Sequence, residues 1–117
     1  LNGNLWLYGG SYAAGANSLW TSTTISGSMA DLWEFNSQTM IWTWEGGSQS
    51  LNGPEPVYGT QGVASSQNNP GGRQYSFCWF DTSGDLRLFG GNGSSKPGLT
   101  SGEWGAYFND LWEYQVH

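Results

Sequence analysis

Cysteine and histidine are almost absent from this chain of 117 residues, which contains only Cys78 and His117. A single cysteine cannot form an intrachain disulfide, so the cysteine content says nothing about the redox compartment. One thiol and one imidazole also leave no ligand set for zinc or copper, and no pair for Ser-His-Asp or Cys-His catalysis. We therefore expect no catalytic residue, no metal site and no cofactor, and we predict that the chain is not an enzyme.

Basic side chains are also scarce, because only Arg73, Arg87 and Lys96 stand against nine acidic residues, for a formal net charge of -6. A nucleic-acid binder needs several cations to neutralise phosphates, so that class is excluded, and an anionic membrane surface is disfavoured. No apolar run approaches the roughly 20 residues of a membrane span. The scarcity of lysine beside many Ser, Thr, Asn and Gly residues favours an extracellular or cell-surface location.

Aromatic residues and glycine are abundant instead. The chain has eight Trp, six Tyr and five Phe, and 19 Gly interrupt its apolar stretches. Short aromatic runs between glycine-rich turns are typical of all-β sandwiches, barrels and propellers. We expect an all-β fold.

Two blocks of sequence recur along the chain. Residues 3–10 (GNLWLYGG) are matched 81 positions later by residues 84–91 (GDLRLFGG), and residues 31–35 (DLWEF) are matched 79 positions later by residues 110–114 (DLWEY). The difference of two residues falls between the blocks, as expected for strands joined by loops of variable length. Alternation within the first block predicts a strand with two apolar faces, and hence a sheet that is covered on both sides.

The same alternation and the turn-forming residues between the runs predict six strands, at residues 3–10, 31–36, 40–45, 73–80, 85–91 and 110–116. Residues 36–39 are expected to form a turn and residues 81–84 a hairpin. Cys78 lies in an apolar run and is expected to be buried. Asp31 and Asp110, at equivalent positions before two strands, are expected to bind loop backbone.

These motifs resemble kelch repeats. A kelch blade is a four-stranded antiparallel sheet with a Gly-Gly doublet at the end of its second strand, an aromatic residue in the third and a Trp in the fourth. The positions that match these features are Gly9, Gly10, Phe35, Trp42, Gly90, Gly91 and Tyr114. The spacing departs from the family, since Phe35 lies 25 positions after Gly10 and the period near 80 exceeds the roughly 50 residues of a kelch unit.

The resemblance implies a partial kelch-type β-propeller of the galactose-oxidase-like superfamily, with about one and a half blades. Residues 1–117 are expected to be a single fragment of such a propeller. Residues 1–45 would supply strands 2-3-4 of one blade, residues 46–72 a long inter-blade loop, and residues 73–117 strands 1-2-3 of the next blade. Because a propeller closes with about four to eight blades, we expect other protein segments or copies of the chain to complete it. With its Asp-Leu-Trp strands and a Pro-Gly-Gly-Arg entry from Pro70 to Arg73, the chain resembles the long-repeat kelch domains of extracellular or surface proteins.

A scaffold repeat without a chemical constellation favours a non-catalytic structural or protein-interaction function. One alternative is a carbohydrate-binding module that uses loop aromatics, and the candidates for ligand or partner contact are Trp20, Tyr58, Trp104 and Tyr107. The other alternative is a fragment of a galactose-oxidase-like enzyme whose active residues lie elsewhere. Asn92 begins an Asn-Gly-Ser sequon in an expected loop just after the second glycine doublet, and it is a candidate for N-glycosylation.

Overall fold

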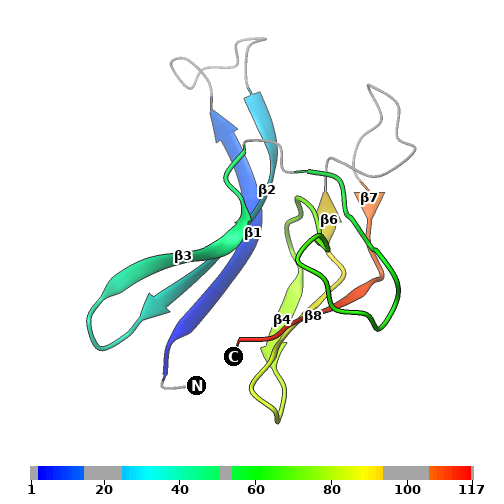
Figure 1. Cartoon of the computed structure of the whole chain (residues 1–117). Coiled ribbons are helices and arrows are strands. Elements are labelled where there is room, and N and C mark those ends of the chain that lie inside the picture. The colour runs from blue at the N-terminus through cyan, green and yellow to red at the C-terminus, as the bar shows by residue number, and fades with distance from the viewer. Residues whose placement is uncertain (1–2, 15–24, 51–53, 94–105, 117) are drawn as a thin grey trace.

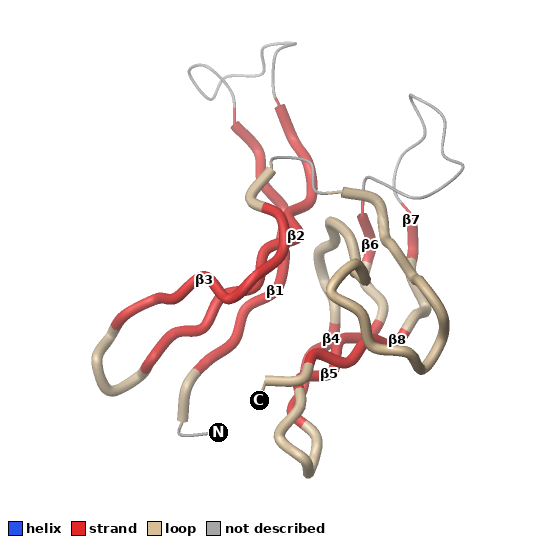
Figure 2. Tube along the Cα trace, in the orientation of Figure 1, coloured by secondary structure: helices blue, strands red, loops and turns tan. Residues whose placement is uncertain are grey.

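The computed structural model describes residues 3–14, 25–50, 54–93 and 106–116, and within these ranges the fold is all-β without a helix. Two three-stranded antiparallel sheets lie beside one another (Figure 1; Figure 2). The first sheet has the order β1-β2-β3, from β1 (Leu5–Ala14), β2 (Ile25–Asn36) and β3 (Ile41–Ser48). The second has the order β4-β5-β8, from β4 (Phe77–Phe80), β5 (Leu86–Phe89) and β8 (Leu111–Tyr114). A short pair, β6 (Asn92–Gly93) and β7 (Ala106–Tyr107), continues beyond β5 and β8.

Several strand boundaries differ from those predicted: β1 ends at Ala14 rather than at residue 10, β3 ends at Ser48 rather than at residue 45, and the short strands β6 and β7 were not predicted. The starts of β2 and β4 differ most. β2 begins at Ile25 rather than at residue 31, because its polar first half pairs with the end of β1, from Ser11 opposite Ser28 to Ala14 opposite Ile25. β4 begins at Phe77 rather than at residue 73. The preceding residues leave the extended conformation, since Tyr75 has a φ of 58°, which is unusual for a residue other than glycine.

Both predicted turns are confirmed, and in each a single side chain organises the turn. The Asn36 Oδ1 atom accepts hydrogen bonds from the N–H groups of Gln38 and Thr39, at 2.9 and 3.0 Å. The Asp81 Oδ1 atom accepts from the N–H groups of Ser83 and Asp85, also at 2.9 and 3.0 Å. Asn and Asp favour turns because they can bind the backbone two residues further along the chain.

The two sheets share one strand register. Leu5 to Tyr8 face Phe35 to Leu32 in the first sheet, and Leu86 to Phe89 face Tyr114 to Leu111 in the second. The equivalence continues past the glycine doublets, where Ser11 faces Ser28 and Asn92 faces Tyr107. The sequence repeat is therefore also a repeat of strand pairing.

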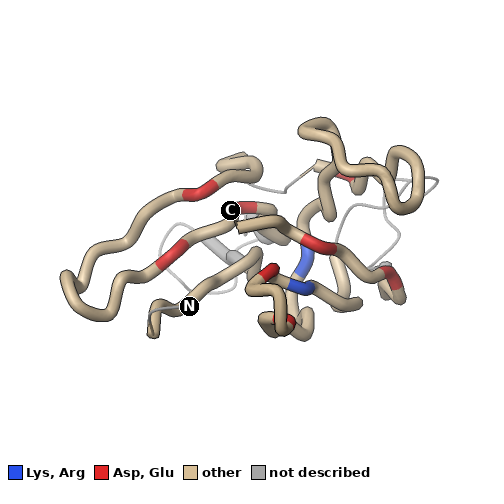
Figure 3. The backbone as a smooth tube through the Cα atoms, turned by 60° about the horizontal axis from the view of Figure 1, so that its bottom comes forward, with Lys and Arg blue, Asp and Glu red and all other residues tan. Residues whose placement is uncertain are grey.

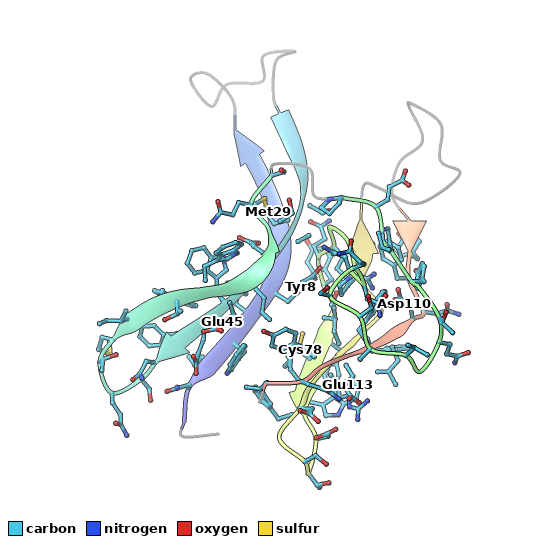
Figure 4. All side chains as sticks on the ribbon, viewed as in Figure 1. Tyr8, Met29, Glu45, Cys78, Asp110 and Glu113 are labelled. Carbon is cyan, nitrogen blue, oxygen red and sulfur yellow. The ribbon has the colours of Figure 1, made fainter. Side chains whose placement is uncertain are left out.

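The sheets pack against one another through the face of β1 that carries Trp6 and Tyr8. The Trp6 ring lies 6.0 Å from Phe80 in an edge-on arrangement and 6.3 Å from Tyr114. Tyr8 and Cys78 lie between the two sheets in Figure 4. The buried apolar residues of the described chain are few, namely Ala30, Leu32, Leu86 and Leu88.

The opposite face of the first sheet is open. It carries two cross-strand rows of apolar side chains, Leu5, Phe35 and Trp42 in one and Leu7, Trp33 and Trp44 in the other. We call these six residues the outer face. Leu5 and Leu7 are 62% and 50% exposed, whereas their repeat equivalents Leu86 and Leu88 are 6% and 5% exposed. The expectation that each sheet is covered on both sides is therefore wrong for the outer face within the structure as described.

Gly9, the first glycine of the doublet, lies where the backbone of Arg73 approaches the first sheet closely, and its substitution tests this approach. Gly9 has a φ of 66°, and a Cβ there would collide with the carbonyl oxygens of Arg73 and Met29. Gly62 has a φ of 79°, and a Cβ there would meet nothing within 4 Å. We expect Gly62→Ala to lower the free energy of unfolding by about 1–2 kcal/mol, the cost of a left-handed conformation. Gly9→Ala should lower it further in urea denaturation, and equal losses would contradict the close approach.

Candidate functional site

Arg73 lies at the centre of the molecule, and the loop that precedes β4 places it there. Residues 54–72 fold back on themselves, since the main chains of Val57 and Asn69 exchange hydrogen bonds of 2.8 and 3.0 Å. The Gly72 N–H donates to the Pro54 carbonyl oxygen at 3.0 Å. Gly71 is buried, and a Cβ there would lie 2.8 Å from the same oxygen. The two glycines therefore let the loop close tightly just before Arg73.

The main chain of Arg73 binds the first sheet. Its N–H group donates to the Met29 carbonyl oxygen on β2 at 3.1 Å, and its carbonyl oxygen accepts from the Gly10 N–H on β1 at 2.9 Å. Tyr8 adds a third link, because its hydroxyl donates to the Gly71 carbonyl oxygen at 2.8 Å. Burial is the main reason why the pKa of Tyr8 is raised above its usual value, so this hydroxyl stays protonated and able to donate.

The side chain of Arg73 binds the second sheet. Its guanidinium is fully buried and forms a bidentate pair with Asp110, Nη1 to Oδ1 at 2.7 Å and Nη2 to Oδ2 at 3.0 Å. Nη1 also donates to the Gly90 carbonyl oxygen at 3.0 Å, and Nη2 donates to the Pro70 carbonyl oxygen. The guanidinium carbon lies 4.0 Å from the centre of the Phe108 ring, a cation–π contact. We call Arg73 with these main-chain and side-chain partners the Arg73 clamp.

Asp110 is held by two further donors. The Trp112 indole Nε1 donates to its Oδ2 atom at 2.8 Å, and the Tyr58 hydroxyl donates to the same oxygen at 2.9 Å. The Tyr58 ring stacks on Trp112, with centroids 5.3 Å apart. Burial acts to raise the pKa of Asp110, but the hydrogen bonds from Arg73, Trp112 and Tyr58 outweigh it and hold the pKa below its usual value. Asp110 is therefore ionised at neutral pH, as the pair requires.

Asp31 repeats part of this arrangement in the first sheet. The Trp33 indole Nε1 donates to Asp31 Oδ2 at 2.8 Å, the same bond and distance as between Trp112 and Asp110. Each carboxylate accepts from an indole two residues further along its strand. No bond from either carboxylate to loop backbone is found among the described residues, so the expectation that both bind loop backbone stays a prediction. Among the described residues, Asp31 has no basic partner.

The residues that match the kelch pattern occupy equivalent places in the two sheets. Gly9 and Gly90 both have a φ of 66°, and Gly10 and Gly91 have φ values of 117° and 95°. Phe35 and Trp42 face one another on β2 and β3, with ring centroids 4.9 Å apart. Tyr114 occupies the position of Phe35 in the second sheet and contacts Trp6.

The candidate loop contacts divide into three groups. Tyr58 is engaged within the chain by Asp110 and Trp112. Tyr107 lies in β7 and is 85% exposed. Trp20 and Trp104 lie outside the described residues.

Asn92 and Cys78 differ from their expected settings. Asn92 lies in β6 rather than in a loop, its main chain pairs with that of Gln74 at 2.7 and 2.9 Å, and its Oδ1 atom is buried. Its glycosylation stays a prediction. Cys78 is exposed rather than buried, although partial burial of its thiol raises the pKa.

The two described basic side chains, Arg73 and Arg87, are both paired with carboxylates. The other described basic residue, Arg87, is paired with Asp81 at 2.7 Å and with Glu113 at 2.5 Å. Within the described ranges, no three His, Cys, Asp or Glu side chains form a group that could hold a metal ion. The same ranges contain no helix long and apolar enough to cross a membrane.

Sequence reasoning placed Arg73 at the start of a strand and at the end of a Pro-Gly-Gly-Arg entry, but it did not predict the ionic partner of Arg73. One available signal was its place after two glycines as one of three basic residues in the chain. A lone cation in an apolar setting needs an acidic partner, and the repeated aspartates were the candidates.

The fold defines an all-β chain built from two small three-stranded antiparallel sheets. No family model matches the chain, and neither a curated protein nor a solved structure matches it. The two sheets of the chain nevertheless match one another in strand register.

Removal of the Asp110 charge tests the Arg73 clamp. Asp110→Asn leaves the buried guanidinium without its ionic partner, and we expect the free energy of unfolding to fall by about 3 kcal/mol. Asp81→Asn removes the carboxylate of the more exposed Arg87 pair and should cost much less. Urea denaturation measures both variants, and equal losses would show that Arg73 and Asp110 do not form the principal pair.

The stabilisation from Asp110 should depend on pH. Its pKa is lowered on folding, so the stabilisation is fully present above the unfolded pKa, about 4, and is lost as pH falls through the lower folded pKa. We expect the difference in stability between the wild type and Asp110→Asn to be constant from pH 7 to 5 and to shrink below about 4. A difference independent of pH down to 2 would contradict an ionised Asp110 as the origin.

Proposed function

We propose that this chain is a non-catalytic structural or protein-interaction scaffold, a piece of a kelch-type β-propeller to which further strands or chains add. The observation that carries the proposal is the repeat of one strand register in two sheets that pack face to face. Blades that repeat a register and stack on their neighbours are the building principle of propellers. The extracellular or surface location stays part of this proposal.

The Arg73 clamp supports the scaffold function because it joins one repeat to the next. Its main-chain bonds go to Gly10 and Met29 of the first sheet, and its ion pair goes to Asp110 of the second. A buried, fully neutralised cation has no charge left to offer a substrate. Tyr58, one of the four candidate loop aromatics, is bound to Asp110 and stacked on Trp112, so it is not free to act as a sugar platform. This favours a scaffold over carbohydrate binding through Tyr58, whereas Tyr107 stays exposed.

Two surfaces that the packing of the sheets leaves exposed both carry large apolar side chains. The outer face of the first sheet exposes Leu5, Leu7, Trp42 and Trp44. The side of the second sheet that points away from Trp6 exposes Phe77, Trp79, Phe89 and Leu111. On that side the Arg87–Glu113 ion pair lies in the same cross-strand row as Trp79, so the apolar row there is Phe77, Phe89 and Leu111. Monomeric proteins rarely expose a contiguous apolar surface such as the outer face.

Stacking of one such surface on the other would be head-to-tail. The outer face would then meet the far side of a second sheet from another repeat or another copy. Contacts of this type generate closed rings when the rotation between neighbours allows it. A ring of stacked blades would bury the outer face just as packing against the first sheet already buries the equivalent Leu86 and Leu88 of the second sheet.

Replacement of the two exposed tryptophans of β3 tests this assembly. We expect the wild-type chain to self-associate in sedimentation velocity, and Trp42→Thr combined with Trp44→Thr to weaken association at least tenfold. Burial of a large apolar side chain stabilises by about 1.5–3 kcal/mol, and threonine keeps the strand propensity.

Val63→Ser is the matched control, because Val63 is equally exposed but lies in the loop away from the outer face. Its association should equal that of the wild type. A folded wild-type monomer at all concentrations would overturn the assembly, and so would a double variant that associates as the wild type does.

A further inference from the structure

The strand edges of the two sheets differ at one equivalent position. β5 lies in the middle of its sheet, with β4 on one side and β8 on the other. β1 occupies the same register position in the first sheet, but it pairs only with β2, so its other edge from Leu5 to Tyr8 has no strand partner among the described residues. An open edge of N–H and C=O groups is a template for a further strand.

The glycine doublets show the same difference. A Cβ at Gly91 would collide with Ser76 and lie 2.7 Å from the Gln74 carbonyl oxygen, because the segment that leads into β4 passes directly over it. A Cβ at the equivalent Gly10 would meet nothing within 4 Å. The Gly10 N–H binds the Arg73 carbonyl oxygen, but no described segment lies within 4 Å on the side where a Cβ would project.

Asp31 is the residue of the first sheet that corresponds to Asp110, the carboxylate partner of Arg73. It holds its indole bond to Trp33 as Asp110 holds its bond to Trp112, but Asp110 also binds the Arg73 guanidinium. The first sheet carries acidic residues, Asp31, Glu34 and Glu45, and no basic residue at all. Figure 3 draws two basic positions, Arg73 and Arg87, and neither belongs to a strand of the first sheet.

We propose that the open edge of β1 and Asp31 together form a docking site for an extended, arginine-bearing protein segment. The strand of that segment pairs antiparallel with residues 5–8, and an arginine four residues before the strand places its guanidinium on Asp31. This deepens the proposed scaffold function and rests on it, since it names the chemistry of the segment that completes the first sheet. The mode of recognition is strand addition, with main-chain bonds for affinity and one charged pair for register.

The site should select arginine over lysine. In the second sheet, the two Asp110 oxygens accept separate N–H groups of one guanidinium, a geometry that a single ammonium cannot reproduce. One contact differs, because Met29 stands at the repeat position of Phe108 and offers no aromatic face to the cation. The first sheet therefore depends more on the bidentate pair than the second sheet does.

The chain itself provides the probe for this site. A fluorescently labelled peptide of residues 70–80, with Cys78→Ser against oxidation, reproduces the segment that completes the second sheet. We expect it to bind the wild-type chain in fluorescence anisotropy, with the position of Phe77 opposite Tyr8 and that of Phe80 opposite Leu5, as the pairs Phe77–Phe89 and Phe80–Leu86 indicate. Arg73→Lys or Arg73→Gln in the peptide should weaken binding at least tenfold, and these arms leave the protein unchanged.

A second set of arms changes the protein. Asp31→Asn should weaken binding of the parent peptide at least tenfold, whereas Glu45→Gln, which removes the same charge from β3, should leave it unchanged. No binding of the parent peptide at 100 micromolar (on the order of a weak interface), equal binding of the Arg73→Gln peptide, or equal binding to Asp31→Asn would each overturn the docking site.

The peptide titration uses chain concentrations below any self-association, so it separates the two proposals. Peptide binding by a chain that never self-associates supports the docking site and removes the stacked propeller. Self-association through the outer face without peptide binding removes only the docking site.

Discussion

The joint between the two sheets depends on a single buried arginine. Transfer of a guanidinium out of water is costly, and the cost is offset only when an opposite charge and further acceptors surround it. Asp110 and the carbonyl oxygens of Gly90 and Pro70 provide these partners, and they do so from the second sheet and its leading loop. Because the main chain of the same residue is bonded to β1 and β2, neither sheet can move relative to the other without exposing or unpairing this charge.

The Arg73 clamp contributes a large share of the stability of the fold because few apolar side chains are buried. Only Ala30, Leu32, Leu86 and Leu88 are buried apolar residues in the described chain, while large side chains such as Trp42 and Trp44 remain exposed. Small domains bury a smaller share of their surface and are correspondingly marginal in stability. The structure thus combines a specific polar joint, the Arg73 clamp, with exposed apolar surfaces. Both are expected of a repeat unit that gains part of its stability from neighbouring units.

The strand positions and the turns could be read from the sequence, whereas the joint could not. Alternating apolar residues located β1, β3, β5 and β8, and Asn36 and Asp81 marked their turns, because these signals are local. The first half of β2 escaped because Ser26, Gly27 and Ser28 carry no strand pattern and are held by pairing with β1. The residues from Arg73 to Ser76 resembled a strand, but only Gln74 keeps a β-bridge, to Asn92. The ionic partner of Arg73, Asp110, lies 37 positions away in sequence, so no local signal marks the pair. Exposure of Cys78 and of the outer face likewise depends on what packs above each sheet.

The way Arg73 binds the first sheet has a consequence for how such a chain could lengthen. Its partners there are the Gly10 N–H and the Met29 carbonyl oxygen, which are main-chain atoms and so tolerate different side chains at position 29. The residues that the joint needs are few: the glycine doublet, Tyr8, the two glycines before the arginine, the arginine itself and one aspartate. Duplication of a gene segment of one repeat length would copy all of these together, and each new unit would arrive with its own joint to the previous one. Surface residues and loops could then diverge freely while the copies remained able to join.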